Sequence, residues 1–120
     1  AQDFGDMFES GNVTASGSSS TRGINAGGGE NGNSNTISFI TIATKGNAEN
    51  FGDLTQAIGN ASGTSNQTRF IRAGGRTPSL VDVIDFVTIA SAGDATDFGD
   101  ITQARRQLAA ASDAHGGLSQ

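Results

Sequence analysis

The sequence predicts an all-β fold made of repeated four-stranded blades, and three observations lead to this prediction. A Phe-Gly-Asp motif occurs three times, with Phe4, Phe51 and Phe98 spaced by 47 residues. Two of the copies are preceded by a segment rich in β-branched and aromatic residues, which favour strands. Glycines and other turn residues divide each unit into short pieces. A fixed period of this length is typical of repeat architectures.

The composition by itself is close to that of a flexible polar linker. Of the 120 residues only 34% are hydrophobic and 18 are glycines, and a chain with so few apolar side chains buries little surface on folding. The periodicity argues against disorder, because low-complexity sequence does not place the same motif three times in step. Tyr and Trp are absent, so the seven Phe residues are expected to provide most of the large-ring packing.

The charge and the missing cysteines exclude several classes. The net charge of −5 opposes binding to nucleic acid, which needs clustered Lys and Arg. The single adjacent basic pair, Arg105 and Arg106, is more in keeping with a solvated turn. The absence of cysteine excludes disulfides and thiolate metal sites. No run of about 18 apolar residues and no basic, apolar leader occurs, so neither membrane insertion nor a signal peptide is expected.

The chain is expected to be one repeat region, residues 1–120, with a first repeat at 1–47, a second at 48–94 and a partial third at 95–120. An ungapped alignment of the first repeat on the second gives 17 identities. The identical residues of the first repeat are Ala1, Phe4, Gly5, Asp6, Ser18, Thr21, Arg22, Ile24, Ala26, Gly27, Gly28, Ile37, Phe39, Thr41, Ile42, Ala43 and Gly46.

Four short strands are expected in each repeat, and the second repeat shows them best. The expected strands are residues 59–63, 68–73, 81–90 and 98–102. The first is small and polar and gives the weakest signal. Gly74-Gly75 ends the second strand, Pro78 marks the next turn because it fixes its own φ, and Gly93-Asp94 precedes the fourth strand. Four strands in one such unit fit a propeller blade, whose repeat is roughly 40–50 residues long.

The third strand indicates how the blades pack. Residues 83–89, Val-Ile-Asp-Phe-Val-Thr-Ile, do not alternate strictly between apolar and polar side chains. A strand covered on both faces has no need of strict alternation. Blades stacked around an axis cover their middle strands on both faces, so the pattern favours a propeller over a lone hairpin sheet.

One segment carries a contrary local signal. Residues 101–111 have high helix propensity. The equivalent residues of the previous repeat, 54–64, contain Gly59 and Gly63, which make a helix unfavourable there. Because equivalent segments of a repeat are expected to share one structure, both are predicted to be non-helical.

The order of the motifs resembles a kelch-type blade. Gly74-Gly75 is followed by Ile84-Asp85-Phe86, then by Phe98, then by Arg105. In kelch blades a double glycine closes the second strand, aromatic residues occupy the third and fourth strands, and an Arg follows. Phe98 stands where those blades usually carry Trp, which departs from the kelch pattern.

The amino-acid sequence of the repeat is similar to that of repeats in long structural proteins of marine tailed bacteriophages, cyanophages in particular. The similar segments are residues 87–105, VTIASAGDATDFGDITQAR, and residues 112–118, SDAHGGL. The resemblance covers the whole chain and is weakest at 7–17 and 30–36. It implies a β-propeller protein of the virion or of an appendage such as a tail, a fibre or a capsid decoration. It implies no catalytic residues.

Paired acidic residues around the Phe-Gly dipeptide offer a possible calcium site. The pairs are Asp3/Asp6, Asn50/Asp53 and Asp97/Asp100. Calcium takes six to eight oxygen ligands, and whether these turns bind it stays open. The favoured interpretation is a turn in which the Asp side chain caps backbone N–H groups, because Asn50 breaks the carboxylate pair.

Other residues that suggest chemistry have simpler interpretations. The glycines at 27–29 and 74–75 lack the Lys and the helix of a phosphate-binding loop, so close backbone approach explains them better. His115 is the only histidine and has no cysteine to share a metal. Arg22 and Arg69 recur at equivalent positions, where they either line a channel or, as favoured here, form a structural ion pair with a repeated Asp. No catalytic, cofactor-binding or metal-binding residue is assigned.

The number of repeats determines the expected partners. Propellers close with 4–8 blades, so two and a half repeats need further repeats. Either the 120 residues are an excerpt of a longer protein, or several copies assemble and each lends its Phe4 strand to a neighbour, or the repeats stack as an open array. In each case the partner is the same protein, because exposed strand edges and apolar faces favour association.

The expected function is therefore non-enzymatic. The chain is predicted to be a structural or adhesion protein, located in the virion or outside the cell, with a host-surface glycan as a further partner. Many weak equivalent sites on a rigid scaffold would bind by multivalency. The alternative is a carbohydrate-binding propeller lectin, although the missing Trp and Tyr remove the usual sugar-stacking side chains.

Overall fold

The computed structural model describes residues 1–9, 14–28 and 32–112, and these residues form an all-β structure of two four-stranded antiparallel sheets. His115 and the end of the predicted third repeat lie outside the described residues. No helix occurs within these three ranges, so the structure there has no apolar helix of the length that a bilayer crossing needs.

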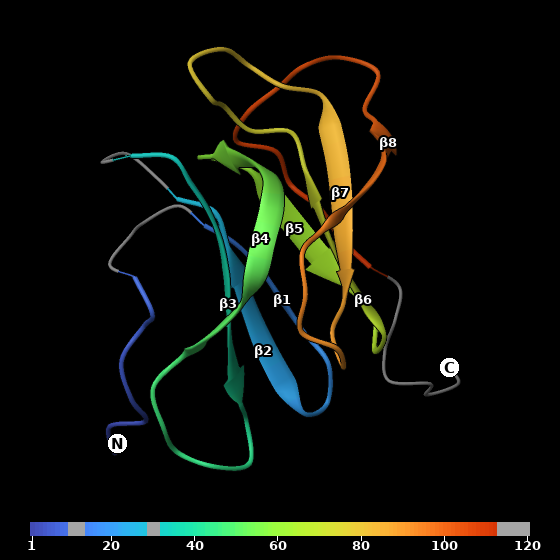
Figure 1. Ribbon diagram of the computed structural model, residues 1–120. Coiled ribbons are helices and arrows are strands. Elements are labelled where there is room, and N and C mark those ends of the chain that lie inside the picture. The colour runs from blue at the N-terminus through green and yellow to red at the C-terminus, as the bar shows by residue number, and fades with distance from the viewer. Residues whose placement is uncertain (10–13, 29–31, 113–120) are drawn as a thin grey trace.

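Each sheet is a simple meander in which sequential strands are neighbours (Figure 1). The first sheet contains β1 (Ala15–Ser18), β2 (Arg22–Ala26), β3 (Ser34–Thr41) and β4 (Glu49–Ile58). The second contains β5 (Ser62–Ser65), β6 (Arg69–Ala73), β7 (Val83–Thr88) and β8 (Thr96–Asp100). The chain leaves the first sheet at β4 and enters the second at β5, and β1 lies against β5 and β6.

The predicted antiparallel strands are confirmed, with shifted ends. The strands expected at 68–73 and 81–90 are β6 and β7, and the latter is shorter than expected. The strand expected at 98–102 begins two residues earlier, as β8. The weak first strand forms as β5, three residues later than predicted. The non-helical prediction for residues 101–111 is also confirmed, because this segment contains neither helix nor strand.

The two sheets share one strand register with an offset of 47 residues. Ile24 of β2 pairs with Phe39 of β3, and Ile71 of β6 pairs with Phe86 of β7. The likeness continues past the fourth strand, because Asn60 and Gln107 both have φ 56°. Left-handed backbone is uncommon in residues other than glycine, so its occurrence at equivalent positions shows that both segments follow the same path.

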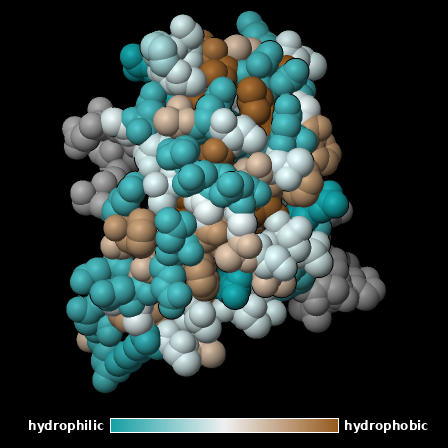
Figure 2. Space-filling view, in the orientation of Figure 1, coloured by the Kyte–Doolittle hydropathy of each residue, from teal (hydrophilic) through white to brown (hydrophobic). Residues whose placement is uncertain are grey.

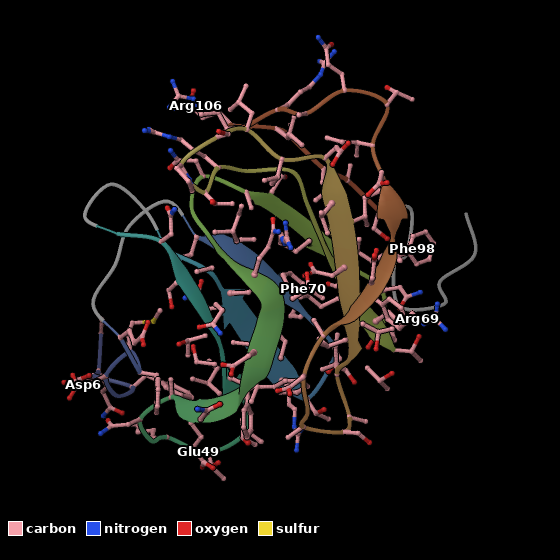
Figure 3. The ribbon with its side chains drawn as sticks, turned by 45° about the horizontal axis from the view of Figure 1, so that its top comes forward. Asp6, Glu49, Arg69, Phe70, Phe98 and Arg106 are labelled. Atoms are coloured by element: carbon pink, nitrogen blue, oxygen red, sulfur yellow. The ribbon has the colours of Figure 1, made fainter. Side chains whose placement is uncertain are left out.

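The hydrophobic core lies between the two sheets. Its buried residues are Ala15, Ile24, Ala26, Ile37, Phe51, Leu54, Ile58, Phe70, Val87 and Ile89. Phe70 of β6 lies at the centre of the molecule (Figure 3) and packs against Gly17 of β1. A Cβ at Gly17 would come within 2.8 Å of the Phe70 ring, so glycine at this position lets the sheets approach closely.

A buried ion pair within the second sheet is hydrogen-bonded to the first sheet. Arg72 of β6 and Asp85 of β7 are both fully buried, and the Arg72 Nη2 atom donates to Asp85 Oδ2 over 2.6 Å. The same Oδ2 accepts hydrogen bonds from the backbone N–H and the hydroxyl of Thr55, which belongs to β4 of the first sheet. The equivalent residues of the first sheet are Asn25 and Ser38, so this pair is present in one sheet only.

Replacing Asp85 alone is expected to destabilise the protein more than replacing both partners. Asp85→Ser leaves the Arg72 guanidinium buried without a counter-ion, which costs about 3–5 kcal/mol. Arg72→Asn combined with Asp85→Ser reproduces the residues of the first sheet and removes both charges. Urea unfolding of the three proteins measures the difference, and a double variant no more stable than Asp85→Ser would contradict the expectation.

Candidate functional site

The described residues hold no cluster that is typical of a metal centre. No group of three or more His, Cys, Asp or Glu side chains lies close together within residues 1–9, 14–28 and 32–112. The buried Arg72 and Asp85 bond to one another and to Thr55 and are shielded from solvent.

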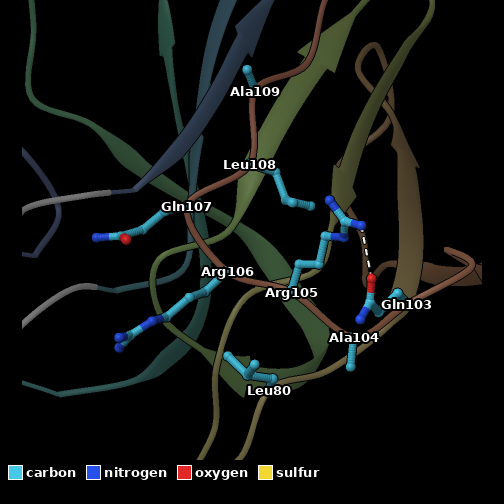
Figure 4. A pocket seen from close by; sticks show the side chains of 8 residues that line it. All are labelled: Leu80, Gln103, Ala104, Arg105, Arg106, Gln107, Leu108 and Ala109. Atoms are coloured by element: carbon cyan, nitrogen blue, oxygen red, sulfur yellow. Dashed lines mark hydrogen bonds between the residues drawn. The ribbon is translucent and has the colours of Figure 1, made fainter.

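One surface hollow, of about 680 Å³, lies at the turn after β8 (Figure 4). It is lined by Leu80 and by residues 103–109. The Arg105 guanidinium donates to Gln103 Oε1 over 2.8 Å, whereas Arg106 and Gln107 point away from it. These side chains diverge rather than converge on one point (Figure 4).

The acidic turns cap their own backbone, as the sequence predicts. Asp3 Oδ1 accepts from the Gly5 N–H over 3.1 Å, and Asp97 Oδ1 accepts from the Gly99 N–H over 2.9 Å. Each bond spans two residues and forms an Asx turn.

The double glycines have a conformational reason. Gly74 and Gly75 have φ of 64° and 103°, and Gly27 has φ of 81°. Such values are unfavourable for residues with a Cβ. A Cβ at Gly75 would also lie 2.8 Å from the carbonyl oxygen of Gly59, so the predicted close approach of backbones is confirmed at this position.

The recurring arginines do not form the expected ion pairs with the repeated Asp residues within the described structure. Instead, Arg22 lies 4.5 Å from the centre of the Phe39 ring, and Arg69 lies 4.6 Å from that of Phe86. A guanidinium above an aromatic ring is attracted by the ring quadrupole. Arg22 also donates to the carbonyl of Ile89, which fixes it across the two sheets.

The feature that recurs most faithfully is a contact that we call the seam. It joins a tail motif (residues 3–6, 50–53 and 97–100) to a docking loop (46–48 and 93–95). In the central seam, the Asp53 carbonyl accepts from the Ala95 N–H over 2.7 Å, and the Asp53 N–H donates to Asp94 Oδ1 over 3.0 Å. A Cβ at Gly52 would collide with the carbonyl oxygen of Gly93.

The first tail motif makes the same contact one repeat earlier. The Ala48 N–H donates to the Asp6 carbonyl over 2.8 Å, and the Asp6 N–H donates to Asn47 Oδ1 over 2.9 Å. A Cβ at Gly5 would collide with the carbonyl oxygen of Gly46. Residues 1–9 form no strand, so the outermost strand predicted around Phe4 is wrong. This segment has instead bound to the chain's own docking loop.

Among the described residues, no docking loop lies against the third tail motif. A Cβ at Gly99 would meet nothing within 4 Å. Phe98 is 56% exposed, whereas the equivalent Phe51 is 3% exposed. Both rings make the same edge-to-face contact, with Phe86 and Phe39 respectively, at 5.9 Å between centroids. Phe98 therefore lacks only an outer cover, and Figure 2 shows apolar atoms at the surface over this sheet.

The tail motif was predictable from the sequence, but its partner, the docking loop, was not predicted. Asn47 and Asp94 follow the glycine of each docking loop and supply an equivalent acceptor, yet they differ in residue type and were absent from the identities between repeats. A signal was nevertheless present, because Gly46 and Gly93 each precede a residue with a side-chain oxygen.

Comparison of the chain with protein-family models and with curated proteins gives no match. The seam is therefore interpreted from its own geometry.

Substitution of equivalent glycines separates the seam from backbone strain. Gly52 and Gly99 have φ of 155° and 150°, so alanine suffers a similar backbone cost at both. Only Gly52→Ala also collides with Gly93, and overpacking of this kind costs about 1–3 kcal/mol. Gly52→Ala is expected to lower the free energy of unfolding by that amount more than Gly99→Ala does. Equal losses, measured by urea unfolding, would show that the seam adds no stability.

Proposed function

We propose that this chain is a non-enzymatic structural or adhesion protein built from kelch-like β-propeller blades, and that it belongs to a phage virion appendage such as a tail, a fibre or a capsid decoration. The observation that carries the proposal is the stacking of two four-stranded meanders, face to face, through contacts offset by 47 residues. For example, the Ser65 hydroxyl bonds to the backbone of Ser18 over 2.9 Å.

The path of the chain supports blades over other all-β arrangements. In a propeller, the outer strand of one blade connects to the inner strand of the next. Here the chain passes from the edge strand β4 to β5, which lies against the opposite edge strand β1. Gly17 and Gly63 allow the inner strands to approach the Phe70 ring closely, as is required where blades converge on an axis.

The proposed virion role rests on the resemblance of the repeat sequence to the repeats of marine phage structural proteins. The composition agrees with it, because a polar chain with a net charge of −5 is suited to an exposed, soluble scaffold rather than to packaging nucleic acid. An array of such blades would present equivalent sites at fixed spacing, and weak binding at each site would add up to firm attachment.

A carbohydrate-binding lectin is the second candidate, and one hollow favours it. This hollow, of about 310 Å³, lies over β1, β2 and β3 of the first sheet. It combines the apolar side chain of Ile40 with the polar side chains of Ser16, Asn25 and Ser38. Sugar sites pair an apolar surface with a few polar groups in the same way, although the ring of Phe39, the one aromatic residue at this hollow, lies on the core-facing side of the sheet.

Two measurements test the proposed function. Antibodies raised against the chain are expected to label an appendage of phage particles in immunogold electron microscopy, and labelling of host proteins alone would overturn the virion role. A glycan array probed with the intact protein distinguishes the lectin. Strong binding to one glycan class, reduced by Asn25→Ala in the hollow and unchanged by Phe8→Ala on the exposed N-terminal segment, would favour the second candidate.

A further inference from the structure

The outer face of the second sheet is a copy of the face that the first sheet buries. Five apolar positions on these faces carry the same residue in both sheets. The pairs are Ile24/Ile71, Ala26/Ala73, Ile37/Ile84, Phe39/Phe86 and Phe51/Phe98. In the first sheet this face forms the core against β6 and β7, whereas in the second it is half-buried or exposed. The second sheet thus presents one half of an interface that the molecule already contains.

The edge of this face ends in a tail motif that has an identical counterpart elsewhere in the chain. Residues 97–100 read Asp-Phe-Gly-Asp, and so do residues 3–6. Residues 97–100 are unbound in the described structure, whereas residues 3–6 are bound to the docking loop at 46–48. Two identical segments and one suitable loop in each molecule create a choice of partner.

We propose that copies of this chain associate head to tail by exchange of the tail motif. Residues 97–100 of one copy displace residues 3–6 from the docking loop of the next copy. Residues 3–6 are therefore a built-in competitor that holds the docking loop closed in the free molecule. The proposal deepens the repeat-array function and rests on it for the arrangement of copies, but it does not depend on the virion or on any glycan.

The exchange reproduces hydrogen bonds that are already present twice. The Asp100 N–H would donate to Asn47 Oδ1 of the next copy, as the Asp6 N–H does within the chain. The Asp100 carbonyl would accept from the Ala48 N–H of that copy, as the Asp6 carbonyl does. Gly99 would occupy the place of Gly5 against the Gly46 carbonyl, where no Cβ fits. Both segments cannot occupy the loop together.

Arg69 and Ile42 form a second complementary pair in the proposed contact, which we call the open seam: residues 97–100 and the outer face of the second sheet of one copy against the first sheet of the next. Arg22 donates to the carbonyl of Ile89, a residue that is 1% exposed. The equivalent groups left open are Arg69, which lies on the same side of the molecule as Phe98 (Figure 3), and Ile42, which is 46% exposed. In the head-to-tail arrangement Arg69 would reach the Ile42 carbonyl of the next copy, and Ile42 would be covered.

The small residues of the two faces also fit this arrangement. Within the chain, Gly17 of the first sheet makes room for Phe70. Between copies the order of sizes is reversed. Thr64 of the second sheet is equivalent to Gly17, and Gly23 of the next copy is equivalent to Phe70. The hollow over the first sheet includes Gly23, so Thr64 would enter existing space.

The internal competitor determines how strongly copies associate. A segment tethered to its own loop acts at an effective concentration of the order of millimolar, so it outcompetes a second copy in dilute solution. Weakening the tethered segment is expected to strengthen association, whereas weakening the free segment is expected to abolish it. These opposite effects at equivalent glycines distinguish the exchange from unspecific stickiness.

Three variants of the full chain test the proposal. Gly5→Ala introduces a collision with Gly46 that expels residues 3–6, Gly99→Ala introduces the same collision only between copies, and the third variant combines both. Light scattering after size exclusion, over a range of concentrations, gives the native mass. Gly5→Ala is expected to form oligomers with an apparent dissociation constant at least about tenfold lower than that of the intact chain. Gly99→Ala and the double variant are expected to stay monomeric.

Two controls keep the result unambiguous. Circular dichroism establishes that each variant keeps its β structure, and Asn35→Ala, at an exposed position of β3 away from the seam, is expected to leave the mass unchanged. A free peptide of residues 1–6 is expected to dissociate the Gly5→Ala oligomers. A monomeric Gly5→Ala protein, oligomers that survive Gly99→Ala, or no effect of the peptide would each overturn the exchange.

Discussion

The face-to-face contact between the two sheets is the interaction on which the rest of the structure depends. Each sheet has four short strands, and only 34% of all residues are hydrophobic, so neither sheet encloses a core of its own. The buried apolar side chains gather at this one contact, with Phe70 against Gly17 at its centre. Because the hydrophobic effect scales with the apolar area removed from water, a chain this polar concentrates its stability where two sheets meet. The outer faces are left free for other contacts.

Charge adds a specific constraint to that contact. The carboxylate of Asp85 receives bonds from Arg72 of its own sheet and from Thr55 of the other sheet. Arg72 Nε and Asp85 Oδ1 have no hydrogen-bond partner, so desolvation of the pair is only partly compensated. Such a pair contributes little net stability, but any sliding of the sheets would break the hydrogen bonds from Thr55 to the buried Asp85 carboxylate. We infer that its role is to fix how the second sheet sits on the first, whereas Asn25 and Ser38 leave the equivalent face of the first sheet uncharged.

Much of the fold follows from local sequence signals. Strands β6 and β7 were predictable from β-branched and aromatic residues, and the turns between them from Gly74, Gly75 and Pro78. The ends of strands were less predictable, because Asp97 has low strand propensity and pairs only because β7 lies beside it. The seam was not predictable from one repeat. Asp53 bonds to Asp94 across 41 residues, and the sequence marks this contact only by the side-chain oxygen that follows Gly46 and Gly93. The ring above which Arg22 lies was likewise missed in favour of an ion pair.

The two sides of the seam, the tail motif and the docking loop, are different surfaces, and this difference limits the symmetry of any assembly of copies. A twofold dimer places the same patch on both partners, whereas here one partner offers the tail motif and the other the docking loop. Contacts of this heterologous kind have a direction, so an assembly made from them has two chemically different ends unless it closes. The rotation relating one sheet to the next decides between a closed cyclic oligomer and a polar helical filament. The few residues that tilt β5 relative to β4, from Gly59 to Ala61, therefore have more influence on the symmetry of the assembly than the strands themselves.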